Sequence, residues 1–398
     1  MRKNIKESVL KALESNAGVP VSGQELANTL GTSRAAIWKA IESLRKDGCA
    51  IEASSNVGYY LSKENNFLSK EGITTALHSL LDLNPITAKT DSNINNSNEK
   101  TKKREDCKEM FLDTESISPQ PINKKNLFFF QSIDSTNKEA SRLISNDGLH
   151  GKPLISILDS SNTDSSNNLQ DNSNSGLYAA IIANEQEKGR GRLGRTFFSP
   201  KDTGLYMSLI IKPNFNIESI TLLTTMVSVS LATVFEKITG KKCQIKWVND
   251  IYLEGKKICG ILTEGVTNFE TGQIDHVILG IGVNCFTETF EETAGPNAGS
   301  LSENVFSRNL LAASIILECQ KLLIEMADYD LTNPSQLQMK RLETYREKSL
   351  LIGKEIIILN TSKTATAMSI GTDGSLIVKY PNGEIEQISS GEVSVRLV

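Results

Sequence analysis

A long polar stretch divides this chain of 398 residues and limits what each side of it can fold into. Between Asn84 and Asn123 the sequence contains runs such as Asp-Ser-Asn-Ile-Asn-Asn-Ser-Asn, with too few apolar residues to build a core. We therefore predict a linker over residues 65–126 that is disordered from 84 to 123. A second polar stretch, residues 159–175, consists almost entirely of Ser, Asn, Asp and Thr, which predicts a mobile insertion on the surface of the following domain.

The N-terminal segment predicts three short helices followed by a hairpin. Apolar residues fall on one helical face between residues 5 and 16, and Ser22-Gly-Gln-Glu25 is a capping box that opens a second helix. Ser33 can cap a third helix, and residues 50–61 alternate weakly around a Ser-Ser-Asn turn. Three helices with one tight turn and a following hairpin are typical of a winged helix-turn-helix, which we assign to residues 1–64.

The region from residue 127 to 346 alternates strand and helix patterns. The predicted strands lie at 127–133, 178–183, 205–211, 244–247, 251–262 and 277–283. The predicted helices lie at 135–145, 218–238 and 309–327. This alternation predicts a mixed α/β or α+β domain. In the remaining segment, 347–398, short strands are separated by turns that contain Asp-Gly and Asn-Gly, which predicts a small terminal β-barrel.

Composition excludes several classes of protein. Lys+Arg 43 and Asp+Glu 47 give a formal net charge of -4, so the chain is not a generally basic nucleic-acid coat, and DNA contact must be confined to one domain. The six cysteines form no C-x-x-C pair and the three histidines are isolated, which predicts buried reduced thiols and no metal site. The N-terminus lacks the apolar segment of a secretory signal, and Ser and Thr interrupt the uncharged run before Glu236, so we expect a cytoplasmic protein without a membrane span.

Three separated motifs carry the chemistry. The first is the loop Gly189-Arg-Gly-Arg-Leu-Gly-Arg195 after a strand, where glycines let the backbone approach a ligand and three arginines supply charge for an anion. The alternative is a disordered RNA-binding tract, but such tracts are usually repeated. The second motif is Lys246-Trp-Val-Asn-Asp250, followed by Lys257-Ile-Cys-Gly-Ile-Leu-Thr-Glu264. The third is Ser135-Thr-Asn137, which alone indicates only a helix N-cap.

Taken together, these motifs resemble the catalytic domain of biotin protein ligases, whose pattern is D-S-T-N, G-R-G-R-x-G-R, K-W-P-N-D and a G-I-L-x-E strand. The resemblance spans residues 127–285, with Val248 in place of the family's proline. The N-terminal Thr-Ser-Arg-Ala-Ala-Ile-Trp-Lys segment resembles the helix-turn-helix of repressor-type members, and Ser390-Gly-Glu-Val-Ser-Val-Arg396 resembles their C-terminal barrel. The implied fold class is α+β, with a winged helix-turn-helix, a central biotin/lipoyl ligase-like mixed sheet with helices, and a small SH3-like β-barrel.

The resemblance implies an ATP-dependent biotin protein ligase. Such an enzyme forms biotinyl-5'-AMP from biotin and ATP, with Mg²⁺ arriving on the ATP, and transfers biotin to a lysine of a carboxyl carrier protein. The implied partners are the biotin carboxyl carrier domain of a biotin-dependent carboxylase, operator DNA, and a second copy of the chain when the adenylate is bound. A biotin-responsive transcriptional repressor is the second implied role.

Making a biotinyl adenylate brings a carboxylate to the α-phosphate of ATP, so fixed cations must offset the repulsion between two anions. The catalytic residues that the resemblance implies are Lys246, Arg190 and Arg192. The implied biotin-binding residues are Ser135, Thr136, Asn137, Gln186, Arg190, Gly191, Arg192 and Lys246. The remaining members of the loop that closes over the adenylate are Gly189, Gly194 and Arg195. No nucleophilic side chain is required, because the acceptor lysine itself attacks the mixed anhydride.

The predicted third helix carries the residues that we expect to contact DNA. The helix-turn-helix segment is Gly23–Glu42, and its DNA-binding residues are Ser33, Arg34, Trp38 and Lys39. These side chains are suited to phosphate contacts and to a few base contacts. The alternative is a helix-turn-helix that serves only protein contacts.

Three other interpretations of the whole chain stay open at this point. A DNA-binding biotin sensor without ligase activity would bind biotin but not modify an acceptor. A lipoate- or octanoyl-transferring relative would share the fold but lacks the G-R-G-R-x-G-R loop. A monofunctional ligase would retain catalysis without sequence-specific DNA binding, which gel shifts at several salt concentrations would reveal.

Overall fold

The computed structural model describes twelve parts of the chain, separated by gaps. These are residues 5–16, 19–54, 57–62, 65–82, 122–156, 176–213, 220–268, 270, 272–303, 305–326, 334–389 and 395–397. The predicted insertion at 159–175 and the predicted disordered segment lie outside the described residues, apart from 122 and 123. The chain forms two compact units, Met1–Glu115 with Ser302–Ser314 and Ser116–Leu301 with Ile315–Val398.

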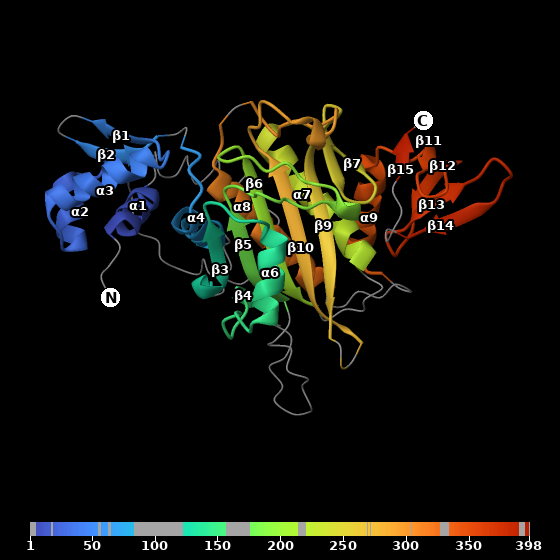
Figure 1. The fold of residues 1–398 in the computed structure, drawn as a ribbon, viewed down its shortest axis with the longest axis horizontal. Helices are drawn as coiled ribbons and strands as arrows, with labels where there is room; N and C mark the ends of the chain where they lie inside the picture. The colour runs from blue at the N-terminus through green and yellow to red at the C-terminus, as the bar shows by residue number, and fades with distance from the viewer. Residues whose placement is uncertain are drawn as a thin grey trace, which may run out of the picture. The chain divides into compact units, whose positions relative to one another are not determined.

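The first unit begins with three helices and a hairpin. The helices are α1 (Ile5–Ser15), α2 (Gly23–Leu30) and α3 (Arg34–Lys46), and the hairpin is β1 (Ile51–Ser54) with β2 (Gly58–Leu61) (Figure 1). The Ser22 hydroxyl accepts a hydrogen bond from the Glu25 amide at 3.0 Å, and the Ser33 hydroxyl accepts one from the Ala36 amide at 3.2 Å. Each bond satisfies a backbone N–H that the first turn of a helix leaves unpaired. The predicted winged helix-turn-helix is therefore confirmed.

Helix α4 (Lys70–Asp82) lies inside the segment 65–126 that the sequence predicts to be a linker. The structure differs here because Ile73 and Leu77 are fully buried and Leu80 is also buried. These apolar side chains recur at three and four residues, which is the spacing of one helical face. The polar composition of the longer segment conceals this short periodic stretch.

The start of α4 is held by residues far along the chain. Helix α8 (Arg308–Met326) begins in the first unit, where the side-chain Oδ1 of Asn309 accepts a hydrogen bond from the Ser69 amide at 3.0 Å. The Arg308 Nε donates to the Asn66 carbonyl, also at 3.0 Å. These bonds explain why residues 302–314 belong to the N-terminal unit.

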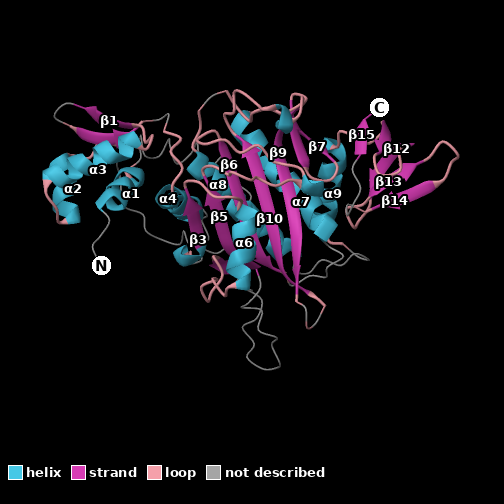
Figure 2. Cartoon of the chain, in the orientation of Figure 1, coloured by secondary structure: helices cyan, strands magenta, loops and turns pink. Residues whose placement is uncertain are grey.

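The second unit is built on one eight-stranded sheet (Figure 2). Its strand order is β3-β5-β6-β10-β9-β8-β7, with β4 beside β5, and all neighbours are antiparallel except β3 with β5. The strands are β3 (Leu127–Phe130), β4 (Ile155–Ser156), β5 (Gly176–Ala183), β6 (Gly204–Lys212), β7 (Cys243–Lys246), β8 (Asp250–Leu253), β9 (Lys256–Thr267) and β10 (Ile274–Asn284). The predicted mixed sheet is thereby confirmed.

Helices cover both faces of this sheet. They are α6 (Thr136–Ser145), α7 (Ile220–Thr239), the later part of α8, and α9 (Gln336–Lys348). Glu264 on β9 contacts Asn137 of α6, whereas its neighbour Thr263 contacts Thr224 of α7 at 2.7 Å between hydroxyl oxygens. Because successive side chains of a strand point to opposite faces, α6 and α7 must lie on opposite sides.

Helix α7 is the uncharged segment that the sequence predicts to be a buried helix. It is long and apolar enough to cross a membrane by length and composition alone, but 72% of its most apolar window is buried inside the protein. Thirteen of its side chains, from Leu222 to Phe235, are buried. This burial fits a core helix that packs against β7, β9 and α9.

The C-terminal segment forms a five-stranded antiparallel sheet in the order β14-β13-β12-β11-β15. The strands are β11 (Glu355–Ile358), β12 (Lys363–Ile370), β13 (Leu376–Lys379), β14 (Ile385–Ile388) and β15 (Val395–Leu397). The predicted Asp-Gly and Asn-Gly turns connect β12 to β13 and β13 to β14. The indole N–H of Trp247 donates to the Gly374 carbonyl at 3.0 Å, so this sheet is tied to the end of β7.

Candidate active site

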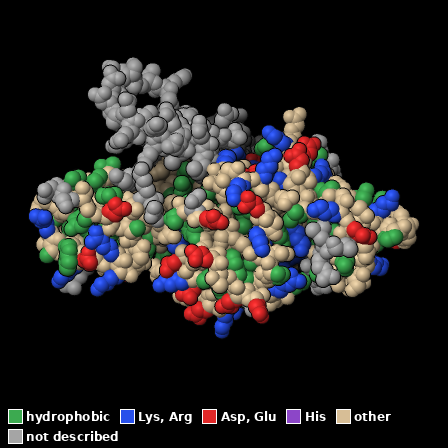
Figure 3. All heavy atoms as spheres, turned by 90° about the horizontal axis from the view of Figure 1, so that it is seen from above, with side chains coloured by type: hydrophobic (Ala, Val, Ile, Leu, Met, Phe, Trp, Pro, Cys, Tyr) green, Lys and Arg blue, Asp and Glu red, His purple; other side chains and the backbone are tan. Residues whose placement is uncertain are grey.

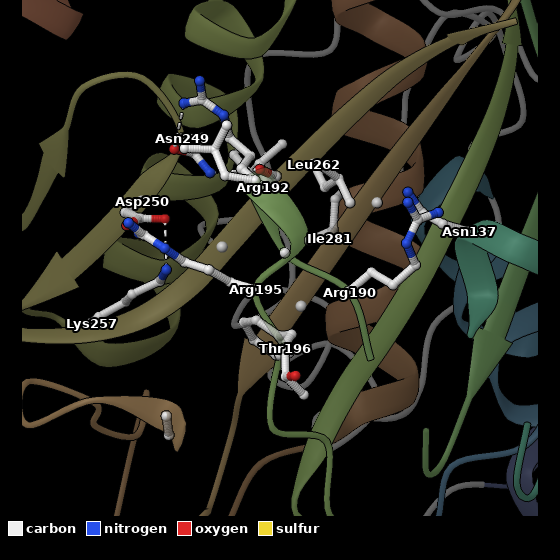
Figure 4. A pocket seen from close by; sticks show the side chains of 18 of the residues that line it. Asn137, Arg190, Arg192, Arg195, Thr196, Asn249, Asp250, Lys257, Leu262 and Ile281 are labelled. Carbon is white, nitrogen blue, oxygen red and sulfur yellow. Dashed lines mark hydrogen bonds and ion pairs between the residues drawn. The ribbon is translucent and has the colours of Figure 1, made fainter. Parts of the chain in front are cut away.

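A cavity of about 550 Å³ lies on the α6 side of the large sheet, where the three sequence motifs meet. Its size falls in the range of small-molecule and cofactor sites. The predicted ligand-binding residues that line it are Ser135, Thr136, Asn137, Gln186, Arg190, Gly191, Arg192, Gly194, Arg195 and Lys246. Figure 4 shows arginine side chains of the loop distributed around this cavity.

One end of the cavity is formed by the first turn of α6. Ser135 occupies the N-cap position, yet its side chain makes no capping hydrogen bond. Thr136 and Asn137 instead face β6, where the Ser208 hydroxyl lies 2.7 Å from the Thr136 Oγ1 and 2.6 Å from the Asn137 Oδ1. The motif therefore positions side chains against the sheet, which exceeds the capping role that its sequence alone indicates.

Gln186 lies behind Thr136 and is largely committed to the protein. Its Oε1 accepts hydrogen bonds from the Thr136 amide at 2.9 Å and from the Thr136 hydroxyl at 3.1 Å. Its Nε2 donates to the Ser199 hydroxyl at 2.9 Å. A primary amide has two N–H donors, so one remains for a ligand.

Strand glycines create the floor of the cavity. A Cβ atom on Gly280 would lie 2.3 Å from the Asn137 Oδ1, and one on Gly282 would lie 2.5 Å from the Phe197 ring. Both glycines line the cavity, as does Phe197, and sequence reasoning assigned none of them. The signal that could have found them is the Gly-Ile-Gly pattern inside a strand, because glycine within a strand marks a close approach by another group.

The Gly-Arg loop folds back on itself above this floor. The Phe197 amide donates to the Gly189 carbonyl at 2.9 Å, and the Gly191 amide donates to the Arg195 carbonyl at 2.7 Å. A Cβ on Gly189 would lie 2.2 Å from the Phe197 carbonyl oxygen, so only glycine permits this crossing. Gly189 does not line the cavity itself, and its place in the loop is structural.

Three cationic side chains approach the cavity from two elements. The Arg190 Nη1 lies 3.3 Å from the Glu264 Oε1, and the Arg192 Nη1 donates to the Asn249 Oδ1 at 3.3 Å. The side-chain ammonium group of Lys246, at the end of β7, makes no hydrogen bond or ion pair with any residue that the structure describes. Burial lowers the pKa of the Lys246 ammonium and of the Arg192 guanidinium, and Asp250 opposes this shift.

A second group of charged residues lies beside these cations. Lys257 forms an ion pair with Asp250, with 2.7 Å between its Nζ and the Oδ1, and both residues line the cavity with Asn249 (Figure 4). The sequence motifs contain these three residues, but no role was assigned to Asn249 or Lys257. The ion pair joins Asp250 at the start of β8 to Lys257 on β9. Within the described ranges, no three His, Cys, Asp or Glu side chains are grouped as metal ligands would be.

The predicted DNA-binding residues lie on or beside α3 in the first unit. Trp38 is 54% exposed, which is unusual for a large aromatic side chain on a helix of a small domain. Arg34 and Lys39 are also exposed, and Ser33 caps the helix. On the face of the molecule that Figure 3 shows, basic and acidic side chains are interspersed, as the near-balanced charge predicts.

Family models match three parts of the chain in order. An "HTH domain" model matches residues 6–60, the "Biotin/lipoate A/B protein ligase family" model matches 155–284, and the "Biotin protein ligase C terminal domain" model matches 351–396. Residues 155–284 are therefore similar to the biotin/lipoate A/B protein ligase family. The three matches lie one after another along the chain, and the cavity is lined by residues of the second match and of its neighbours.

Individual relatives agree with this assignment. The bifunctional ligase/repressor BirA of Escherichia coli strain K12 is 27% identical over 402 aligned positions, which span 100% of this chain and 99% of that protein. BirA of Bacillus subtilis strain 168 is 28% identical over 284 residues, which span 71% of this chain and 66% of that protein. The solved biotin protein ligase from Aquifex aeolicus in complex with biotin and ATP is 25% identical with a TM-score of 0.52, covering 69% of this chain and 100% of that chain.

Proposed function

We propose that the protein is an ATP-dependent biotin protein ligase that forms biotinyl-5'-AMP and transfers biotin to a lysine of a biotin carboxyl carrier domain. The observation that carries this proposal is one cavity that is lined by uncharged hydrogen-bonding side chains at one end and by cationic side chains elsewhere. Hydrogen-bonding side chains of α6 line one end, and Arg190, Arg192 and Lys246 supply positive charge. Such a cavity suits the bicyclic urea of biotin at its hydrogen-bonding end. Its cationic side chains suit the biotin carboxylate and the phosphates of a nucleotide.

The first chemical step joins two anions. The biotin carboxylate attacks the α-phosphorus of ATP, a C–O–P anhydride bond forms, and the bond to the β-phosphate breaks to release pyrophosphate. Arg192 and Lys246 stabilise the negative charge that accumulates on the α-phosphate, and Arg190 neutralises the carboxylate. Lys246 is suited to this role because its ammonium group forms no ion pair with a carboxylate of the described residues, and the nearby charge of Asp250 favours its protonated form.

The second step needs no nucleophile from the enzyme. The neutral ε-amine of the acceptor lysine attacks the biotinyl carbonyl carbon, an amide bond forms, and AMP leaves. Mg²⁺ that arrives with ATP would neutralise charge on the phosphates. The loop 189–197 excludes water from the anhydride when it closes over the adenylate.

We further propose that the first unit binds operator DNA through α3 and that the adenylate-bound chain forms a homodimer. The exposed Trp38, Arg34 and Lys39 support the DNA contact. The full-length match to a ligase/repressor supports the combination of the two roles in one chain. We assign the protein to the cytoplasm, without a membrane partner.

The enzyme assignment is tested by mass spectrometry of a biotin acceptor domain incubated with the purified chain, ATP and biotin. We expect a mass gain of one biotinyl group that requires ATP and that excess lipoate does not prevent. Binding of biotin without a mass gain would favour the sensor, and modification by lipoate would favour the lipoate-transferring relative.

Replacement of Lys246 tests the site. We expect Lys246→Ala to lower the rate of biotinyl-5'-AMP formation by about 100-fold or more, because it removes a charge aimed at the transition state. The melting temperature should change little, since the ammonium makes no bond within the described structure. Lys241→Ala is the matched control, because Lys241 is exposed and pairs with Glu254 outside the cavity. Normal adenylate formation by Lys246→Ala would remove Lys246 from the site.

A further inference from the structure

One carboxylate joins two of the elements that form the cavity. Glu264, on β9, accepts a hydrogen bond from the Asn137 Nδ2 at 2.6 Å through its Oε2. Its other oxygen, Oε1, lies 3.3 Å from the Arg190 Nη1. Asn137 belongs to α6 and Arg190 to the Gly-Arg loop, and Figure 4 shows the Arg190 guanidinium extending toward Asn137. The sheet thus contacts the helix and the loop through the two oxygens of one side chain.

The contact with Glu264 fixes which way the Asn137 amide faces. On the opposite side of this amide, the Ser208 hydroxyl lies 2.6 Å from the Asn137 Oδ1. A carboxylate can only accept hydrogen bonds, so the amide nitrogen must point to Glu264 and the amide oxygen to Ser208. The absence of a side chain on Gly280 leaves the space in which this arrangement fits.

The same carboxylate restrains a loop that otherwise bonds mainly to itself. The Arg190 side chain is 45% exposed and Glu264 is 30% exposed, so their ion pair is partly screened by water. Such a pair contributes little to the stability of the whole protein. Its effect is positional, because a long arginine side chain samples many rotamers unless a partner selects one.

We infer that Glu264 is a positioning residue that sets Asn137 and Arg190 in their ligand-binding orientations before biotin arrives. This inference rests on the proposed function. Glu264 itself need not contact substrate, since its two oxygens are already occupied by Asn137 and Arg190. Removal of its charge therefore leaves the reacting groups in place but lets Asn137 rotate and Arg190 leave the cavity wall. The cost falls on biotin binding, because both positioned groups act on biotin in the proposed mechanism.

The test is steady-state and binding analysis of E264Q, which keeps the size of the side chain and removes its charge. We expect the KM for biotin and the Kd for biotin to rise about tenfold, which is the effect of losing one charge-assisted hydrogen bond. The KM for ATP should stay within about twofold. A general structural defect would move all of these quantities together. In the absence of ligands, trypsin should also cleave the loop 190–195 faster in E264Q than in the wild type.

E254Q is the matched control, because Glu254 also forms an ion pair with a basic side chain but does not line the cavity. A biotin KM in E264Q equal to that of E254Q, with the wild type active, would overturn the inference and leave the proposed function intact. A wild type that neither binds nor transfers biotin would overturn the proposed function instead.

A double variant distinguishes the positioning role of Glu264 from a loss of stability in E264Q. The increase in biotin Kd caused by E264Q should shrink at least threefold when Arg190→Ala is already present, because one of the two positioned groups is then missing. An unchanged increase in that background would show that Glu264 does not act through Arg190.

Discussion

Gly280 shows how the absence of a side chain shapes the cavity. A Cβ at this position would lie 2.3 Å from the Asn137 Oδ1, so Gly280→Ala must displace Asn137. We expect the KM for biotin to rise about tenfold or more, because the added methyl group displaces Asn137. Overpacking of this kind costs on the order of 1–3 kcal/mol. The measurement is biotin titration of the adenylation rate.

Gly265→Ala is the matched control for this change. Gly265 is also a strand glycine, but its added Cβ would meet the flexible end of Ile274, and it faces the α7 side of the sheet. We expect Gly265→Ala to change the melting temperature without changing the KM for biotin. Equal changes in KM for Gly265→Ala and Gly280→Ala would show that strand packing in general, rather than Asn137, controls biotin binding.

Glu14 links the stability of the first unit to pH. Burial raises the pKa of its carboxyl group to about 8, with a further increase from Glu71, although a hydrogen bond from Ser69 lowers it. Between pH 4.5 and about 8 the folded chain holds a proton that the unfolded chain releases, so the free energy of unfolding falls as pH rises through this range. The stability contribution is fully present below pH 4.5.

We expect Glu14→Gln to stabilise the protein at pH 8 by at least about 1 kcal/mol, because the neutral amide removes the cost of ionising a buried acid. At pH 5 the two proteins should have similar stability. Denaturant unfolding of the first unit at both pH values measures the difference. A stabilisation that is the same at pH 5 and pH 8 would contradict the assignment.

At the residue scale, sequence patterns predicted which side chains meet but not how they are held. Most residues of the motifs at 135–137, 189–195 and 246–250 line one cavity, because each motif follows or precedes a strand that its own apolar pattern predicts. The partnership of Glu264 with Asn137 joins positions 127 residues apart. No local pattern encodes such a contact, so the contact of Glu264 with Asn137 could be recognised only in the fold.

At the element scale, long periodic segments were predictable and short segments in a polar context were not. Helix α7 and strands β6 and β10 carry continuous apolar signals, and their predicted positions agree with the structure within a few residues. Helix α4 was concealed by the polar residues around it. Its first turn depends on Asn309, which lies 240 residues from Ser69, so its formation depends on tertiary contacts.

At the scale of the whole molecule, the two proposed activities lie in separate units and should be separable by mutation. Lys39→Ala should weaken DNA binding by a similar factor for all sequences and reduce the slope of log K against log salt by about 1, as loss of one phosphate contact requires. Biotinylation should be unaffected, because Lys39 lies outside the cavity-forming unit. Fluorescence anisotropy with operator fragments at several salt concentrations measures both quantities.

Lys11→Ala on α1 is the matched control, because Lys11 is exposed but lies outside the helix-turn-helix segment. Equal losses for Lys11→Ala and Lys39→Ala would indicate general electrostatic attraction instead of docking through α3.

The order of the three domains was predictable from sequence because each has its own apolar periodicity. The inclusion of residues 302–314 in the first unit was not, because it arises from the return of a distant segment.

The bond between the Trp247 indole and Gly374 has a consequence for how this chain can be divided. Trp247 directly follows Lys246, and Val395 of the last strand also lines the cavity. A fragment ending at residue 350 would lose the indole's acceptor and one side of the cavity at once. The terminal sheet is therefore a part of the cavity-forming unit that cannot be replaced freely. Insertions, deletions or domain fusions in this sheet must preserve its contact with the end of β7 if the enzyme is to remain active.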